Sequence, residues 1–428
     1  MENPNNSSQP KSEQQTSKSP QPPKSPPPPP PMKGKQWQKQ SSEKTTARKQ
    51  YVKGEEQDST VETSTSIKQM VKDAFQNKAS DIHIRVGEIP RFRIQGQIYP
   101  AKGYENTTPE MFQKYIRENL NPRQQKEFWE HKELDTALYY PGFIRCRLNC
   151  FETLNGGAMV LRLISLTVPS IDELKLPQVL KEIIHKTQGL VLITGPTGSG
   201  KSTTLAAMIR YLNETASKHI ITIEDPIEYV HNSQQCLVSQ RELGLHTYDF
   251  HASLRGALRE DPDVILIGEM RDRATVNIAL QAAQTGHLVL GTLHTRSAVN
   301  SINRLLNLYN PEEQHAMRVQ ISESVAAVVS QLLIPTTDGG RTGVHDILLN
   351  TPAMQDYLYK GDEDSAIHLM RLGSMDGMQL MNQAIYEQIE LNRIDLEEAR
   401  KYSPEPSELD RLMRTGGFDA SSSPRDWS

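Results

Sequence analysis

The feature that most constrains this chain is one stretch, Leu190 to Leu205, with the sequence LVLITGPTGSGKSTTL. Its apolar first part, Leu190 to Ile193, has the length and branching of a buried strand and stops where a glycine-rich loop begins. The loop fits GxxxxGK[ST] at every fixed position, and the residues that follow it have a helical pattern. The sequence therefore predicts a strand, a phosphate-binding loop and a helix in that order.

Each fixed residue of the loop has a chemical purpose. Gly195, Gly198 and Gly200 lack a Cβ, so backbone N–H groups can turn around phosphate oxygens at little steric cost. Lys201 supplies a flexible ammonium for the β- and γ-phosphates, and Ser202 supplies a hydroxyl for Mg²⁺. A glycine-rich turn without a ligand is the alternative, which the flanking strand and helix disfavour.

The helix after the loop is expected to begin at Thr203, where its N-terminal dipole favours negative charge. The pattern thus predicts that a nucleoside triphosphate, ATP with Mg²⁺, binds to this segment. The predicted nucleotide-binding residues are Gly195, Pro196, Thr197, Gly198, Ser199, Gly200, Lys201, Ser202 and Thr203.

The chain is too long for one average domain, because it has 428 residues. Its first 64 residues contain a proline run from Pro26 to Pro31, much Ser, Gln and Lys, and almost no aliphatic residue. Such a segment cannot bury enough apolar surface to offset the entropy of ordering, so we predict a disordered tail that acts as a spacer or tether. Docking of the polyproline run on an aromatic groove is the alternative.

Charge and cysteine usage exclude several classes of protein. The formal net charge is −4 and the folded part has no long basic block, so bulk electrostatics do not favour a nucleic-acid partner. The apolar runs, such as Val264 to Ile267, are far shorter than the ~20 residues that span a bilayer. Cys146, Cys150 and Cys236 form no paired framework and no zinc motif, so we expect packed thiols in a reducing cytoplasm.

The pattern of strands and helices divides the chain. A helical IKQMVKDAF, an alternating SDIHIRV and the later antiparallel pieces DTALYY, FIRCRLNCF and AMVLRLI predict a small α+β domain. HIITIED, DVILIGEM and HLVLGTLHT then alternate with helical patterns, which predicts a parallel, doubly wound α/β sheet. The pattern from Ala298 to Pro335 is helical, and Val344 to Leu349 is one more strand. The predicted divisions are residues 1–64 (tail), 66–166 (α+β domain), 167–177 (linker), 178–352 (nucleotide domain), 353–402 (helices) and 403–428 (flexible tail).

Acidic residues follow two of the predicted parallel strands. Glu269 comes directly after VILIG, as in a Walker B element, where a carboxylate faces Mg²⁺ or the attacking water. Glu224, Asp225 and Glu228 follow IITI, where they could hold a metal through water and orient a nucleophile or could cap the next helix. We expect Glu269 to be an active-site residue and leave both roles open for the second group.

Two histidines flank the last predicted parallel strand. A lone histidine is more often a structural group than a catalyst, and that is the expectation for His287. His294 ends the strand that is expected to lie beside the phosphate-loop strand. From there it could sense hydrolysis at the γ-phosphate.

Four ordered segments together resemble a known family. GPTGSGKST, IITIEDPIEYVH, DPDVILIGEMRD and QTGHLVLGTLHT look like the Walker A, Asp box, Walker B and His box of the type II/IV secretion ATPase superfamily. Within it the chain is most similar to the PilT-like pilus retraction ATPases, over roughly Ile67 to Tyr402. The resemblance implies a homohexameric ring of subunits, each with a PAS-like N-terminal domain and a RecA-like domain that hold the nucleotide between them.

The resemblance also implies roles for single residues. Glu224 is then the candidate that activates the attacking water, and Glu269 supports Mg²⁺ and that water. Arg145, Arg147 and Arg162 match positions that reach toward the phosphates as arginine fingers in the family. Alternating surface charge on a sheet is the alternative for these three arginines.

Two departures bear on the sub-family. Extension-type members carry a four-cysteine zinc motif, whereas Cys236 is the only cysteine here after Phe151. Retraction-type members carry a helix of sequence AIRNLIRE, whereas residues 353–360 of this chain are AMQDYLYK. The first departure disfavours an extension motor. The second leaves open whether the chain retracts pili, assists another retraction motor or serves a related secretion system.

Three functions follow from these patterns. The favoured one is a motor ATPase at the cytoplasmic face of the inner membrane, where a pilus platform protein would be its partner and pilus retraction and twitching motility its output. The second is a nucleotide-dependent regulatory module, which would need a missing carboxylate or arginine. The third is a nucleic-acid translocase, which should have basic loops that this chain lacks.

Overall fold

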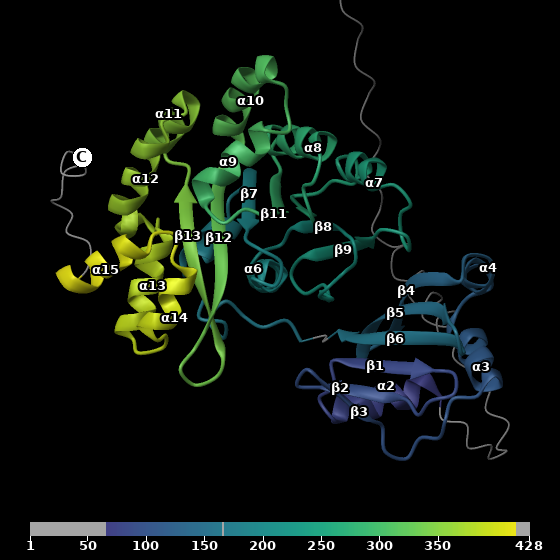
Figure 1. Ribbon diagram of the computed structural model, residues 1–428. Helices are drawn as coiled ribbons and strands as arrows, with labels where there is room; N and C mark the ends of the chain where they lie inside the picture. The colour runs from purple at the N-terminus through teal and green to yellow at the C-terminus, as the bar shows by residue number, and fades with distance from the viewer. Residues whose placement is uncertain (1–65, 165–166, 417–428) are drawn as a thin grey trace, which may run out of the picture. The chain divides into compact units, whose positions relative to one another are not determined.

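The computed structural model describes residues 66–164 and 167–416, which form two sheets with their helices (Figure 1). The predicted disordered tail, residues 1–64, lies outside the described residues. The mixed α/β fold predicted from the sequence is confirmed. Among the described residues no helix has the length and apolar character needed to cross a membrane.

The first sheet has six antiparallel strands in the order β3-β2-β1-β6-β5-β4. Polar caps begin its helices: Ser66, Thr108 and Asn121 each accept a backbone N–H at a helix start. Helix α4 was not predicted, although Asn121 and Gln124 form a capping box and Pro122 is its first residue. The elements are α2 (Ile67–Gln76), β1 (Asp81–Arg85), β2 (Arg91–Ile94), β3 (Gln97–Pro100), α3 (Pro109–Asn119), α4 (Pro122–His131), β4 (Glu133–Tyr140), β5 (Ile144–Thr153) and β6 (Gly156–Ile164).

The second sheet has seven strands in the order β13-β12-β7-β11-β10-β8-β9. All neighbours are parallel except β12 and β13, which are antiparallel. The phosphate-loop strand therefore lies inside the sheet, between β12 and β11. The strands are β7 (Gly189–Thr194), β8 (His219–Glu224), β9 (Leu237–Glu242), β10 (Val264–Ile267), β11 (Leu288–Leu293), β12 (Val325–Pro335) and β13 (Arg341–Leu349).

Helices cover this sheet, and the C-terminal ones gather beside β12 and β13 (Figure 1). Alternate residues of β7 belong to different apolar clusters: Leu190 and Leu192 to one, Val191 and Ile193 to another. The helices are α5 (Val179–Ile184), α6 (Lys201–Thr215), α7 (Phe250–Ala257), α8 (Arg273–Gln284), α9 (Ala298–Leu306), α10 (Pro311–Ser324), α11 (Pro352–Lys360), α12 (Glu363–Leu372), α13 (Met381–Glu390), α14 (Leu396–Tyr402) and α15 (Pro406–Thr415), with a short 3₁₀ turn η1 (Gly373–Asp376).

Three sequence-based expectations are wrong in this part. The segment from Ala298 to Pro335 is not helical throughout, because its last eleven residues form β12, a buried strand paired with β7. The helix after the glycine-rich loop begins at Lys201, two residues before the predicted Thr203. The expected flexible tail 403–428 includes α15, whose buried Leu409 packs with residues of α13 and β13.

Substitutions at the centre and at the edge of the second sheet should differ in how much they lower the free energy of unfolding. Ile193→Ala, at a fully buried position of β7, should lower the free energy of unfolding by about 2–5 kcal/mol because it leaves a cavity. Leu237→Ala, on the edge strand β9 where the side chain is 59% exposed, should change it by less than about 1 kcal/mol. Urea unfolding followed by circular dichroism measures both, and equal losses would contradict this account of the sheet.

Candidate active site

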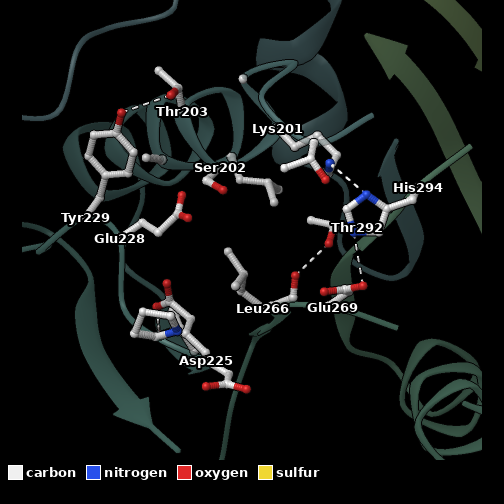
Figure 2. A pocket seen from close by; sticks show the side chains of 18 of the residues that line it. Lys201, Ser202, Thr203, Asp225, Glu228, Tyr229, Leu266, Glu269, Thr292 and His294 are labelled. Atoms are coloured by element: carbon white, nitrogen blue, oxygen red, sulfur yellow. Dashed lines mark hydrogen bonds and ion pairs between the residues drawn. The ribbon is translucent and has the colours of Figure 1, made fainter. Parts of the chain in front are cut away.

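The strand order brings four loops to one edge of the second sheet. β7, β11, β10 and β8 are parallel neighbours, so the loops that follow them start at the same edge. These loops surround a cavity of about 590 Å³ (Figure 2). Residues predicted from four separate motifs line this one cavity, namely Lys201, Ser202, Glu224, Glu269 and His294.

The glycine-rich loop has the backbone that its sequence predicts. Gly195, Gly198 and Gly200 have φ values of +143°, +80° and +87°, which favour glycine. Gly200 is also the N-cap of α6, so the unpaired N–H groups of the first helical turn lie at the end of the loop. Together the loop and the helix start form a concave set of donors suited to an anion.

Lys201 is buried at the base of the cavity. Its Nζ donates to the carbonyl oxygens of Gly195 at 2.8 Å and Pro196 at 3.1 Å, and it lies 3.5 Å from Nδ1 of His294. Burial lowers the pKa of this ammonium, and the nearby carboxylate of Glu269 acts in the opposite direction. An anion between the loop and the lysine would compensate the desolvated positive charge.

Glu269 is held between two partners. Its Oε2 accepts from Arg271 at 2.5 Å, and its Oε1 lies 3.1 Å from Nε2 of His294 (Figure 2). The hydrogen bond from Arg271 is the main cause of the lowered pKa of this carboxyl group. Glu269 is therefore an ionised carboxylate, and through His294 it belongs to the same cluster as Lys201.

Glu224, at the tip of the adjacent strand β8, has a different environment. Its Oε1 accepts from Oγ1 of Thr222 at 2.6 Å and from Nε2 of Gln240 at 3.2 Å. Burial and, to a smaller extent, the nearby Glu228 nevertheless raise the pKa of this carboxyl group to about 7. A carboxyl group with a pKa near neutrality is suited to accept a proton from water.

Ser202 and Glu269 are the two side chains predicted to bind Mg²⁺. No three His, Cys, Asp or Glu side chains of residues 66–164 and 167–416 cluster as a metal site. The hydroxyl of Ser202 and the carboxylate of Glu269 both line the cavity, which fits the prediction that they bind Mg²⁺ directly or through water. The phosphates and water would complete the coordination.

The three candidate arginine fingers lie on the first sheet, with Arg145 and Arg147 on β5 and Arg162 on β6. Arg162 donates to Asp81 at 2.9 Å, and Arg147 lies 4.0 Å from Asp135. They are not among the residues that line the 590 Å³ cavity. A role at the phosphates therefore stays a prediction.

His287 and the three cysteines are packed or hydrogen-bonded outside the cavity. Nδ1 of His287 lies 3.1 Å from the carbonyl oxygen of Ala282, at the end of α8 and away from the cavity. Cys146 and Cys150 are fully buried, and burial raises the pKa of each thiol to about 12. Cys236 is buried as well, so the expectation of packed thiols is confirmed.

The structure adds residues to the site that the sequence analysis did not single out. The hydroxyl of Tyr229 lies 2.9 Å from that of Thr203, and Oγ1 of Thr292 donates to the carbonyl oxygen of Gly268 at 2.6 Å (Figure 2). Arg271 lies two residues after Glu269 and contacts it. Tyr229 and Arg271 belong to the quoted Asp-box and Walker B segments, so their place in those segments was the available signal.

Comparisons with known proteins agree with this geometry. The family model described as Type II/IV secretion system protein matches residues 55–399. The chain is 42% identical, over 78% of its length and 97% of the relative, to the type IV pilus retractation ATPase PilT of Pseudomonas aeruginosa, and 38% identical, over 79% and 88%, to the type IV pilus ATPase PilU of the same organism. A crystal structure of the pilus retraction motor PilT with bound ADP matches with a TM-score of 0.77 at 41% identity, over 81% of this chain and 99% of that one.

The two glutamates should respond oppositely to pH in the protein without nucleotide. The pKa of Glu224 is raised from 4.5 to about 7, so its contribution to stability is fully present below pH 4.5 and is lost as pH rises through 7. Glu224→Gln should therefore gain stability relative to the wild type between pH 5 and pH 8, by up to about 3 kcal/mol.

Glu269→Gln is the matched control. Because the pKa of Glu269 is lowered, its contribution to stability is present above 4.5 and is lost only as pH falls below that value. Thermal unfolding of the wild type and both variants at pH 5 and pH 8 measures the difference. A constant gap between the wild type and Glu224→Gln would contradict the account of Glu224.

Proposed function

Because the chain belongs to the type II/IV secretion system protein family, we propose that it is a motor ATPase that couples ATP hydrolysis to type IV pilus retraction and twitching motility. The observation that carries the proposal is the single cavity that combines a phosphate-binding loop with two carboxylates of different protonation behaviour. Similarity to PilT over most of the chain supports retraction as the output.

The proposed chemistry assigns each group one task. The glycine-rich loop and Lys201 bind the β- and γ-phosphates. Ser202 and Glu269 would hold Mg²⁺, which would neutralise part of the phosphate charge. Glu224 accepts the proton of the attacking water, because its pKa near 7 allows it to be ionised yet basic. His294 contacts both Lys201 and Glu269, so it is placed to sense the loss of the γ-phosphate.

The mechanical part of the proposal concerns assembly and place of action. We propose a homohexamer in which Arg145, Arg147 or Arg162 completes a site after domain closure or from a neighbouring subunit. Its partner would be an inner-membrane pilus platform protein, and the motor would act at the cytoplasmic face of that membrane. Membrane association would then come through the partner.

An accessory pilus or secretion ATPase is the second candidate. The departure of residues 353–360 from AIRNLIRE leaves this function open. A regulatory module without turnover is less consistent with a site that has all its carboxylates. Deletion of the gene separates the first two, because loss of a retraction motor should abolish twitching motility and loss of an accessory motor should only weaken it.

Lys201→Ala should abolish nucleotide binding or turnover while the fold survives. The change removes one ammonium from the cavity and no apolar core contact, and the loss of a phosphate contact costs several kcal/mol of transition-state stabilisation, so the ATPase rate should fall by about 10²-fold or more. Lys186→Ala, at an exposed lysine, is the matched control and should keep the wild-type rate. A folded Lys201→Ala protein with wild-type turnover would reject the proposed site.

Glu224→Gln and Glu269→Gln should differ in kind. The amide at position 224 keeps shape and hydrogen bonding but cannot accept a proton, so ATP and Mg²⁺ should still bind while turnover falls by about 10²- to 10⁴-fold. Glu269→Gln should also slow turnover, and it should change the Mg²⁺ dependence of turnover more than Glu224→Gln does. Titrations of ATP and of Mg²⁺ against turnover measure both, and normal hydrolysis by Glu224→Gln beside a dead Glu269→Gln would move the general base to Glu269.

A further inference from the structure

A buried glutamine lies behind the glycine-rich loop and has no part in the chemistry above. Gln331 is on β12, where its side chain is 2% exposed. It follows Ser330, the last residue of β12 that is paired with β7, whose partner there is Thr194. Gln331 is therefore the residue of β12 that lies beside the start of the loop at Gly195.

Both ends of the Gln331 amide are used by the loop and its helix. Nε2 donates to the carbonyl oxygen of Ser199 at 2.6 Å, and Oε1 accepts from Oγ1 of Thr204 at 2.6 Å. A carbonyl oxygen can only accept, so the NH₂ group must face Ser199 and the orientation of the amide is fixed. The two bonding partners, Ser199 and Thr204, flank Lys201 and Ser202 in the sequence. Lys201 and Ser202 make the proposed phosphate and Mg²⁺ contacts.

The loop backbone also lies unusually close to this residue. A Cβ at Gly195 would lie 2.3 Å from the carbonyl oxygen of Gln331, and a Cβ at Gly200 would lie 2.8 Å from its Nε2. Both distances are shorter than real Cβ contacts. Contact with Gln331 thus helps to explain why the first and last of these three loop positions are glycines.

The hydrogen bond to Ser199 fixes the direction of a peptide group. A loop that turns its N–H groups toward an anion must turn its carbonyl groups away, and a buried carbonyl without a partner costs free energy. Gln331 supplies that partner for Ser199 and ties it to the first turn of α6 through Thr204. Glycine-rich segments have little restraint of their own, so such an anchor reduces the entropy that nucleotide binding must overcome.

We propose that Gln331 is a positioning residue that holds the phosphate-binding loop in its anion-binding conformation before the nucleotide arrives. The inference rests on the proposed function of the cavity as an ATP site. Part of the nucleotide affinity would then come from a side chain that does not line the cavity.

The test is Gln331→Met, which keeps the length of the side chain and removes both hydrogen bonds. Affinity for MgADP, measured by titration calorimetry on the full chain, should fall about ten- to a hundredfold, because the loop loses its anchor. KM for ATP should rise by a similar factor, and kcat at saturation should fall less, because bound phosphates can restore the loop.

Controls come from the neighbouring positions. Ser330→Ala changes the adjacent buried residue of β12, whose hydroxyl has no hydrogen-bond partner among the described residues, and should leave MgADP affinity unchanged. Thr204→Val removes one of the two hydrogen bonds from the helix side, and Thr204→Ser keeps the hydroxyl. Thr204→Val should weaken MgADP binding and Thr204→Ser should retain it, which carries the test if Gln331→Met does not fold.

A folded Gln331→Met protein with the MgADP affinity of the wild type would overturn the inference. Equal losses in Thr204→Val and Thr204→Ser would also contradict it, because the hydroxyl would then have no role. Failure of the proposed function is distinguishable, since in that case the wild type itself would not bind MgADP.

Discussion

The site depends on one constraint: a loop that presents backbone N–H groups to an anion must have its carbonyl groups satisfied by the protein. In this chain Lys201 binds the carbonyl oxygens of Gly195 and Pro196, and Gln331 binds that of Ser199. The loop is therefore tied at its beginning by the residue that is expected to contact phosphate and at its end by a residue of the neighbouring strand. The position of β7 inside the sheet makes the second tie possible, because β12 lies directly beside it.

The same sheet order explains why acids from distant parts of the chain meet. Glu224 and Glu269 end or follow β8 and β10, which are parallel neighbours. Their surroundings then separate them: an arginine and a histidine contact Glu269, whereas Thr222 and Gln240 are the neutral partners of Glu224. Two carboxylates of the same type thus acquire shifts of pKa in opposite directions, which is how a site can use one for a cation and the other for a proton.

The motif-bearing strands could be predicted from sequence because each is a short apolar run bounded by turn or polar residues. β12 could not, since VAAVVSQLLIP mixes alanine, leucine and glutamine with valine and directly follows a true helix, so periodicity alone does not separate strand from helix. Because β12 was not predicted as a strand, Gln331 could not be placed beside the glycine-rich loop. The edge strand β9 was missed for another reason, because its sequence LVSQRE has little apolar alternation and its Leu237 is exposed.

The helix that departs from the retraction-type sequence keeps its two buried apolar positions. In α11 the positions that correspond to the isoleucines of AIRNLIRE are Met354 and Leu358, which are apolar and buried. The differences that change polarity or charge fall elsewhere. Asp356, Tyr359 and Lys360 are exposed, whereas Gln355 and Tyr357 are partly buried and Tyr357 packs against the apolar core. Buried positions determine how a helix packs and exposed ones determine what it presents, so the substitutions keep the two fully buried apolar contacts of α11 and alter mainly its outer surface. None of residues 353–360 lines the 590 Å³ cavity, so these substitutions change a surface of α11 and not the lining of the candidate active site.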